Sequence, residues 1–362
     1  MILSLTVAAC SDSSSSAKKK VIEREGVTDS IFKPKDLETT VNNLVTAIAE
    51  TDATEMRMDV NLKSLSGYWD PIVVGANRAM SELDVTGDVS SPQKDTGDEA
   101  IQEQVQMLKD AREAGTNGIA VAPFETPATE EINAASDAGI PVVTIDSDLP
   151  DSKRDLYIGT LNDAAGKTGG ETLVEYLPSG GGTVIILGHD DPGWPAGYAR
   201  SMGAKEVLED AGYTVVVRRT DWTTEGEDLD LAFLAEAIAN ADPPVVGMIG
   251  MFSNAFRCAM AAEAASLTAD DVAIAAFDFD AKTVSYMESG LIRATHAQRQ
   301  YYMGYLTPYV LYGMNVLGKE ETLKILDKQV VDGDLFNAGL DIVAGDQLDE
   351  YYSFLDDLGV GG

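Results

Sequence analysis

The stretch GIAVAPFETPATEEINAASDAGIPVVTIDSD, residues 118–148, contains one complete strand–helix–strand unit. Its outer parts, GIAVA and IPVVTI, are short apolar runs of the kind that form buried strands. Between them, Thr126 followed by Pro127 has the order expected of a helix start, and Gly139 lies where a helix C-cap belongs. The stretch therefore predicts a helix that connects two neighbouring strands of a parallel sheet.

The same alternation of strands and helices runs through most of the chain. It begins with MRMDVNLKSL (56–65), restarts after DSDLPDSKRDLYIGT (146–160), and continues to the strand LIRATHA (291–297). Such alternation is typical of parallel, doubly wound sheets. Two runs of about a hundred residues each predict an α/β fold of two doubly wound, parallel-sheet, Rossmann-like domains.

The first strand departs from this pattern. Its apolar positions Met56, Met58, Val60 and Leu62 alternate strictly with Arg57, Asp59, Asn61 and Lys63, whereas a strand buried on both faces should be apolar throughout. We expect one face to be wet, or to be covered by an additional amphipathic helix at 36–50.

The pattern of the N-terminal residues predicts a targeting segment. MILSLTVAAC (1–10) resembles the end of a lipoprotein signal peptide with Cys10 as the acylated residue, and a polar tether follows it. We predict a signal remnant at 1–10, a tether with the additional helix at 11–55, and a lipid-anchored protein outside the cytoplasm. If Cys10 carries lipid, Cys258 has no disulfide partner, and we expect it to be a buried, inert thiol.

The composition excludes some partners. The 362 residues include 60 acidic and 26 basic ones, a net charge of −34. Nucleic acid and anionic membrane surfaces would repel such a chain, so we expect contact with a membrane only through the lipid anchor. The acidic excess is typical of a solvated surface and suggests a saline habitat.

Candidate binding residues follow the strands, because ligands of open α/β sheets lie beyond the carboxyl ends of the strands. Aromatic rings cover the apolar C–H faces of sugars, while carboxylates, arginine and amides bind their hydroxyls. The residues at these positions are Tyr68, Trp69, Asp146, Ser147, His189, Trp194, Arg200, Trp222, Ser253, Asn254 and Asp278. This set favours a sugar or a polyol as the ligand.

Catalytic and cofactor motifs do not emerge from the sequence. Gly-Lys-Thr at 166–168 has six residues between Gly159 and Gly166, whereas a phosphate-binding loop requires four. We instead expect this segment to be a small-residue helix face, with Asn162 as its N-cap. The sequence has two histidines and no nucleophile or metal-ligand spacing, so we expect no catalytic residue, no metal and no cofactor. An enzyme that uses the acids of DSD (146–148) with His189 remains an alternative.

Residues 56–335 resemble the ribose-type periplasmic sugar-binding proteins of ABC transporters. The segments that carry the resemblance are GIPVVTIDSD (139–148), YIGTLNDAAGKTGGE (157–171), VAIAAFDFD (272–280) and IRATHAQRQYYMGY (292–305). The resemblance implies two lobes around a ligand cleft, 56–158 plus 299–327 and 159–298 plus 328–362. It also implies a hinge of three crossovers, near 155–160, 278–282 and 297–301.

The resemblance also implies roles for individual residues. Tyr68 and Trp69 match paired aromatics, Trp222 an aromatic from the other lobe, and Asp146, Arg200, Asp278 and Gln298 match hydroxyl-binding residues. Two positions depart from the family: Ser147 stands where ribose binders carry Arg, and FSNAF (252–256) only approximates the pattern in which Ser253 and Asn254 would act. Ribose itself is therefore not the expected ligand.

The resemblance implies a monomeric receptor that delivers its ligand to a membrane permease. A receptor for a sensor or chemotaxis system is an alternative that the sequence does not separate from it. Sugar-responsive repressors share the fold, but they need an N-terminal DNA-binding helix-turn-helix, which this acidic chain lacks.

Overall fold

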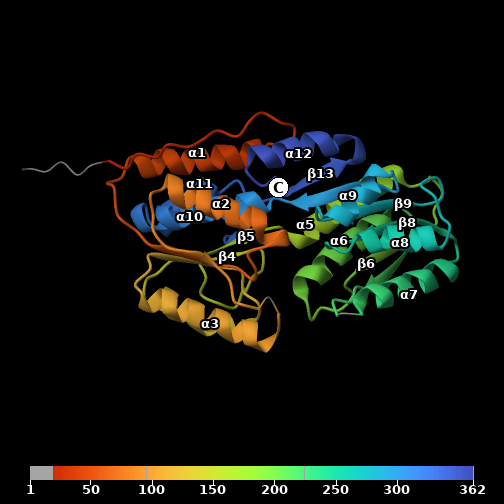
Figure 1. Cartoon of the computed structure of the whole chain (residues 1–362), viewed down its shortest axis with the longest axis horizontal. Coiled ribbons are helices and arrows are strands. Elements are labelled where there is room, and N and C mark those ends of the chain that lie inside the picture. The colour runs from red at the N-terminus through yellow and green to blue at the C-terminus, as the bar shows by residue number, and fades with distance from the viewer. Residues whose placement is uncertain (1–18, 95, 224, 362) are drawn as a thin grey trace, which may run out of the picture.

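Two mostly parallel sheets, each covered by helices on both faces, make up the molecule (Figure 1). The structure is a computed structural model, and it describes residues 19–94, 96–223 and 225–361. The predicted signal remnant and Cys10 lie outside the described residues. The prediction of two doubly wound α/β domains is confirmed.

The first sheet has the strand order β11-β12-β5-β4-β3-β1-β2, and every neighbouring pair except β11–β12 is parallel. Its strands are β1 (Met58–Asn61), β2 (Val89–Ser90), β3 (Gly118–Val121), β4 (Val142–Ile145), β5 (Leu156–Gly159), β11 (Val330–Val331) and β12 (Leu335–Asn337). Its helices are α1 (Lys35–Ala49), α2 (Asp70–Glu82), α3 (Gly97–Glu113), α4 (Thr129–Asp137), α10 (Gln300–Val316) and α11 (Lys319–Leu326), with short helices η1 (Gly67–Trp69) and η2 (Thr126–Ala128).

Alternating side chains of this sheet pack on opposite helix layers. Ile119 and Val121 pack with residues of α3 and α4, whereas Ala120 of the same strand belongs to the core around α2 and α10. The period of two residues in a strand produces this division. It explains why the quoted stretch is apolar at successive positions, as a strand buried on both faces requires.

The second sheet has the order β13-β10-β9-β8-β6-β7, in which only β13 is antiparallel to its neighbour. Its strands are β6 (Thr183–Gly188), β7 (Thr214–Arg219), β8 (Val245–Gly250), β9 (Ala273–Phe277), β10 (Ile292–Gln298) and β13 (Leu340–Ala344). Helices α5 (Asn162–Tyr176) and α6 (Pro195–Asp210) cover one face, and α7 (Gly226–Ala239), α8 (Phe256–Ala264) and α9 (Ala281–Glu288) the other. The short helix η3 (Gly345–Gln347) and α12 (Leu348–Asp357) end the chain.

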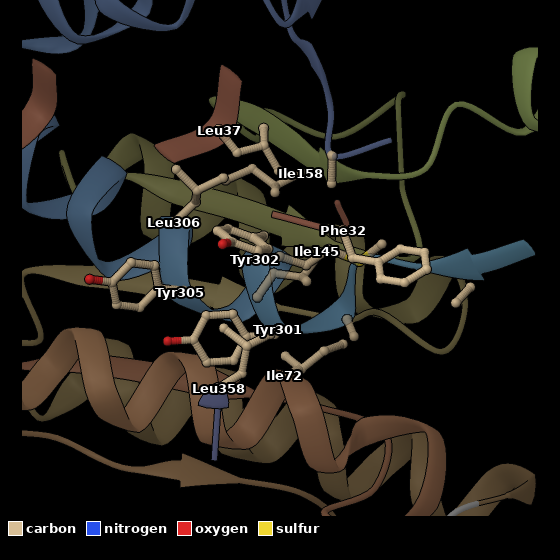
Figure 2. Packing of buried hydrophobic residues seen from close by; sticks show 14 of the residues in the cluster. Phe32, Leu37, Ile72, Ile145, Ile158, Tyr301, Tyr302, Tyr305, Leu306 and Leu358 are labelled. Carbon is tan, nitrogen blue, oxygen red and sulfur yellow. The ribbon is translucent and has the colours of Figure 1, made fainter. Parts of the chain in front are cut away.

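The additional N-terminal helix is present as α1, and it packs on α10 rather than on a strand. Figure 2 shows Leu37 of α1 in one cluster with Tyr301, Tyr302 and Tyr305 of α10. The Arg24 guanidinium reaches the Glu38 carboxylate at 2.7 Å, and the Tyr302 hydroxyl donates to the same carboxylate at 3.0 Å. The segment before the first strand is therefore a part of the first domain's core.

Neither face of β1 is exposed to solvent. Asp59 and Asn61 are buried on the face that α3 covers, and the Arg57 guanidinium lies 2.6 Å from the Asp59 carboxylate. The additional helix is not what covers the polar face. The polar row continues past the end of the strand to Lys63.

The chain crosses between the sheets three times, at 160–161, at 299 and at 338–339. The first and second crossings lie where the sequence predicted them. The crossing predicted near 278–282 is wrong, because β9 and β10 on either side of it pair with each other in the second sheet. The predicted boundary at 328 is also wrong, because β11 and β12 belong to the first sheet and the chain crosses only after them.

Candidate functional site

Two aspartates occupy equivalent places in the two sheets. Asp146 follows β4 and Asp278 follows β9, each at the carboxyl end of its strand. Both have a positive φ, 62° and 66°, a conformation that costs an L-residue roughly 1–2 kcal/mol. Strained backbone of this kind clusters at ligand sites, where it aims a side chain that a relaxed turn would direct elsewhere.

The first domain holds its aspartate through a chain of hydroxyl groups. The Tyr68 hydroxyl donates to Asp146 Oδ1 at 2.6 Å, and the Ser147 hydroxyl donates to Oδ2 at 3.1 Å. Trp69 packs edge-on against Tyr68, with ring centroids 5.3 Å apart. The Lys63 ammonium donates to Ser147 Oγ at 2.6 Å. Lys63 was not among the predicted binding residues, although it continues the polar row of β1.

The second domain holds its aspartate through an arginine and a glutamine. Gln298 Nε2 donates to Asp278 Oδ1 at 2.9 Å, and Gln298 Oε1 accepts from the Arg200 guanidinium at 3.2 Å. Arg200 also donates to Asn162 Oδ1 and to the Met251 carbonyl, each at 2.9 Å. Asn162 was predicted to cap α5, but Leu161 is in the cap position and the Asn162 side chain holds Arg200 instead.

The two groups lie within electrostatic range of each other. Burial raises the pKa of Tyr68 well above its usual value, and the negative charges of Asp146 and Asp278 raise it further. Burial also raises the pKa of Asp278, opposed by Arg200 and Gln298 and supported by repulsion from Asp146. Charges from both domains thus influence the Tyr68 hydroxyl and the Asp278 carboxyl, so the two groups of residues lie near each other.

An aromatic cluster of the second domain stands beside Arg200, whose guanidinium carbon lies 5.5 Å from the centre of the Phe252 ring. Phe252, which was not among the predicted binding residues, stacks on Trp194 at 4.8 Å and meets the edge of Trp222 at 5.7 Å. His189 is buried and packs edge-on against Trp194 at 5.2 Å. Trp194 and Trp222 remain 39% and 54% exposed, so this cluster presents flat apolar surface to solvent.

Ser253 and Asn254 have different environments. Ser253 is exposed, whereas Asn254 is buried and its Nδ2 donates to Thr220 and, at 3.4 Å, to Asp230. Asp230 is itself fully buried and lies 2.5 Å from the Arg257 guanidinium. Asn254 Oδ1 is buried without a hydrogen-bond partner in the described part of the chain. A buried acceptor without a partner is costly unless a ligand or water donates to it.

The described residues also contain a hollow and a free thiol. Within residues 19–361, positions 95 and 224 aside, no three His, Cys, Asp or Glu side chains gather closely enough to hold a metal. A hollow of about 710 Å³ lies beside Ile292 and Arg293, at the amino end of β10 and so at the edge of the sheet opposite Asp278. Cys258 is a buried free thiol, as predicted, and burial raises its pKa to about 12.

The family model for the periplasmic binding protein domain matches residues 60–320. The chain belongs to the periplasmic binding protein family. Membership of this family implies a location outside the cytoplasm. In the described parts of this periplasmic binding protein, none of the helices is both long and apolar enough to cross a bilayer. A search of curated proteins found no match.

Solved structures of sugar-binding relatives share the fold. A sugar-binding protein of a sugar ABC transporter from Bacillus halodurans has 24% identity and a TM-score of 0.68, covering 83% of this chain and 100% of its own. An ABC transporter solute-binding protein from Burkholderia graminis, in complex with D-arabinose, has 26% identity and a TM-score of 0.66, covering 82% and 98%. A periplasmic ribose ABC transporter protein from Conexibacter woesei has 17% identity and a TM-score of 0.72, covering 84% and 97%.

Proposed function

We propose that this protein captures a sugar or a cyclic polyol in the cleft between its domains and delivers it to the permease of an ABC transporter. The proposal applies to this chain what the family match suggests and what the names of the similar structures say of those proteins. It does not involve a chemical reaction, so the ligand should leave the protein unchanged.

One observation supports the proposal: in each domain a carboxylate lies beside hydrogen-bond donors, and we propose that these two groups form the walls of the cleft. Asp146 stands beside the Tyr68 and Ser147 hydroxyls, and Asp278 beside Gln298 and Arg200. A sugar hydroxyl both donates and accepts a hydrogen bond, so it can satisfy a carboxylate and a neighbouring donor at once. Because charge-assisted hydrogen bonds are the strong ones, such a wall favours a ligand with several hydroxyls over an apolar one.

The aromatic residues support a ring-shaped ligand. Tyr68 and Trp69 belong to the first domain, while Trp222 lies beside Phe252 in the second. Indole rings cover a wider area than phenyl rings, which favours a six-membered ring. Ser147 is small and leaves room for such a ring. His189 and Ser253 complete the proposed site at its border, and Asn254 Oδ1 is an acceptor for one more hydroxyl.

The same proposal includes a monomeric protein that is attached to the membrane surface through Cys10, with no metal or cofactor. Metabolic labelling with a fatty-acid probe would test the attachment. Incorporation should disappear in a Cys10→Ser variant, and equal labelling of both proteins would contradict it.

Isothermal titration of the purified protein tests the main proposal. The probes are D-ribose, D-arabinose, D-xylose, D-glucose, D-galactose and myo-inositol, and at least one should bind with micromolar affinity, about −8 kcal/mol. Small-angle scattering with that ligand should show a smaller radius of gyration, because the two walls close on it. Folded protein that binds none of the six probes would contradict the proposal, and so would conversion of a probe to a product.

A further inference from the structure

The segment that precedes α1 is attached to the first domain at both of its ends. We call residues 24–33 the strap. At its start, the Arg78 guanidinium of α2 donates to the Glu25 carbonyl at 2.8 Å, and the Arg24 guanidinium donates to the Glu38 carboxylate of α1 at 2.7 Å. At its end, the chain continues into α1, which packs on α10. The strap is therefore a part of the first domain.

The middle of the strap is bonded to α12, which follows the last strand of the second sheet. The Thr28 amide and hydroxyl donate to the Asp357 carboxylate at 2.7 and 2.6 Å. The Ile31 amide donates to the Glu350 carboxylate at 3.2 Å. Because Glu350 lies in the first turn of α12 and Asp357 is its last residue, the strap follows nearly the whole length of the helix.

Helix α12 is held in both domains. Tyr351 packs edge-on against Phe279 of the second domain, with ring centroids 4.8 Å apart. On the other side, Tyr351 packs edge-on against the buried ring of Phe32 in the strap, also at 4.8 Å. Leu358, just past the helix, lies with Phe32 in the cluster around Tyr301 of the first domain (Figure 2). The strap and α12 thus join the two domains outside the three crossings.

These contacts exist in a conformation in which the two groups of proposed binding residues lie near each other. The Asp278 carboxylate of the second domain is within electrostatic range of Tyr68 in the first. Tyr351 is likewise within electrostatic range of Arg299, at the second crossing. A rotation about the crossings that moved Asp278 away from Tyr68 would have to displace α12 either from the strap or from the second domain. The contacts of α12 therefore favour the arrangement in which the domains are close.

We propose that the strap and α12 form a clasp that favours the closed arrangement of the two domains, and that the clasp raises the affinity for the ligand without contacting it. The strap precedes the residues that the family model matches, and α12 follows them. When only a fraction of the molecules is closed, the measured Kd rises in inverse proportion to that fraction. The effect on affinity rests on the proposed function, whereas the effect on the arrangement of the domains does not.

Two pairs of variants test the clasp. Phe32→Leu replaces the buried ring by a smaller apolar side chain, and its control, Ile31→Ala, shortens the neighbouring side chain, which is 63% exposed. Asp357→Ala removes the acceptor of both Thr28 bonds. Its control, Asp356→Ala, removes the adjacent exposed carboxylate of the same helix. Only the first variant of each pair removes a side-chain contact between the strap and α12.

Small-angle scattering without ligand measures the arrangement of the domains, and circular dichroism shows that each variant is folded. Phe32→Leu and Asp357→Ala should have a larger radius of gyration than the wild type, because the closed arrangement loses contacts that favour it. The two controls should match the wild type. A merely structural role would lower the melting temperature and leave the radius of the folded protein unchanged, and that result would overturn the inference.

Calorimetry tests the effect on affinity, with whichever of the six probe compounds the wild type binds most tightly. Phe32→Leu and Asp357→Ala should each raise Kd about threefold or more, and the controls should leave it unchanged. A larger radius with an unchanged Kd would overturn the link to affinity, and a smaller radius or a lower Kd would overturn the clasp. If the folded wild type binds none of the probes, the proposed function fails, and the scattering comparison still decides whether the clasp holds the domains together.

Discussion

At the scale of single residues, the proposed binding site includes two aspartates in a conformation that few residues adopt. Asp146 and Asp278 both follow strands, and that position could be predicted from the sequence alone. Their positive φ could not, because Asp has only a modest preference for the left-handed region. The strain is compensated by hydrogen bonds to each carboxylate, from Tyr68 and Ser147 in one case and from Gln298 in the other.

Replacing Asp278 by Asn tests whether this carboxylate binds the ligand. The change keeps the size of the side chain but replaces one charged acceptor oxygen with an NH₂ donor, so affinity should fall by about 1.5–3 kcal/mol, the range for a hydrogen bond to a charged group. Calorimetry with the one of the six probe compounds that the wild type binds most tightly measures the loss of affinity. Asp270→Asn, which alters an exposed carboxylate of the same domain, is the matched control. Equal affinities of the two variants would show that the Asp278 carboxylate does not bind the ligand.

The residues that sequence analysis missed share a physical reason. Lys63 belongs to the polar row of β1, and such a row indicates solvent unless the buried carboxylate of Asp59 is known. Phe252 lies two residues beyond the end of β8, where a large apolar side chain resembles an ordinary core residue. Asn254 was predicted as a binding residue, but its amide nitrogen donates hydrogen bonds to Thr220 and Asp230, which lie far from it in the sequence. These assignments depend on contacts between separate elements, which periodicity does not encode.

At the scale of elements, the pairing of α5 with α6 positions Arg200. The Gly-Lys-Thr segment lies inside α5, and the prediction of a closely packed small-residue face is confirmed. A Cβ on Gly166 would lie 1.9 Å from the Arg200 carbonyl oxygen, and one on Gly203 of α6 would lie 2.3 Å from the Asp163 carbonyl oxygen. The two backbones thus approach each other closely enough for Asn162 to reach the Arg200 guanidinium.

Gly166→Ala should therefore damage both stability and binding. Helix propensity alone favours Ala by about 1 kcal/mol, but the clash with the α6 backbone should dominate and destabilise the protein by roughly 1–3 kcal/mol. Because α6 carries Arg200, a displacement of α6 should also weaken the binding of the probe compound that the wild type binds most tightly. Urea unfolding and calorimetry measure the two effects. Gly26→Ala has no atom near the new Cβ and should be neutral in both, whereas an unchanged Gly166→Ala protein would contradict the packing argument.

At the scale of the whole molecule, the three crossings lie side by side and are bonded to one another. The Ala338 amide donates to the Gly159 carbonyl at 2.8 Å, which joins the first and third crossings. Arg299, at the second, donates to Asp341 at 2.8 Å and to the Ala338 carbonyl at 3.3 Å. The location of two crossings could be predicted from the sequence. The third could not, because β11 and β12 are too short to produce a recognisable strand pattern.

Both ends of the described chain also join the domains. Helix α12 follows β13 of the second sheet, and its Tyr351 packs on Phe279 at 4.8 Å. Leu358, just past this helix, lies in the first domain's core near Tyr301 and Ile72 (Figure 2). Residues before α1 contact the same helix, since Thr28 donates to the Asp357 carboxylate. The segments outside the family match thus connect the two domains on the side where α1 and α12 lie (Figure 1).

Phe32 is the apolar centre of this connection, and its truncation tests whether the connection contributes to the fold. Phe32 is buried and packs edge-on against Tyr351 at 4.8 Å and near Phe354 at 6.4 Å. Removing its ring leaves a cavity between three elements that cannot easily collapse, so Phe32→Ala should lower the free energy of unfolding by about 3–5 kcal/mol in urea. Val21→Ala alters a residue of the same segment that is 68% exposed, and it should cost less than about 0.5 kcal/mol. If the two variants unfold at the same urea concentration, the segment does not contribute to the stability of the domains. If Phe32→Ala alone is destabilised, the residues before the family match are part of the cooperative fold, and any motion of the hinge has to carry them along.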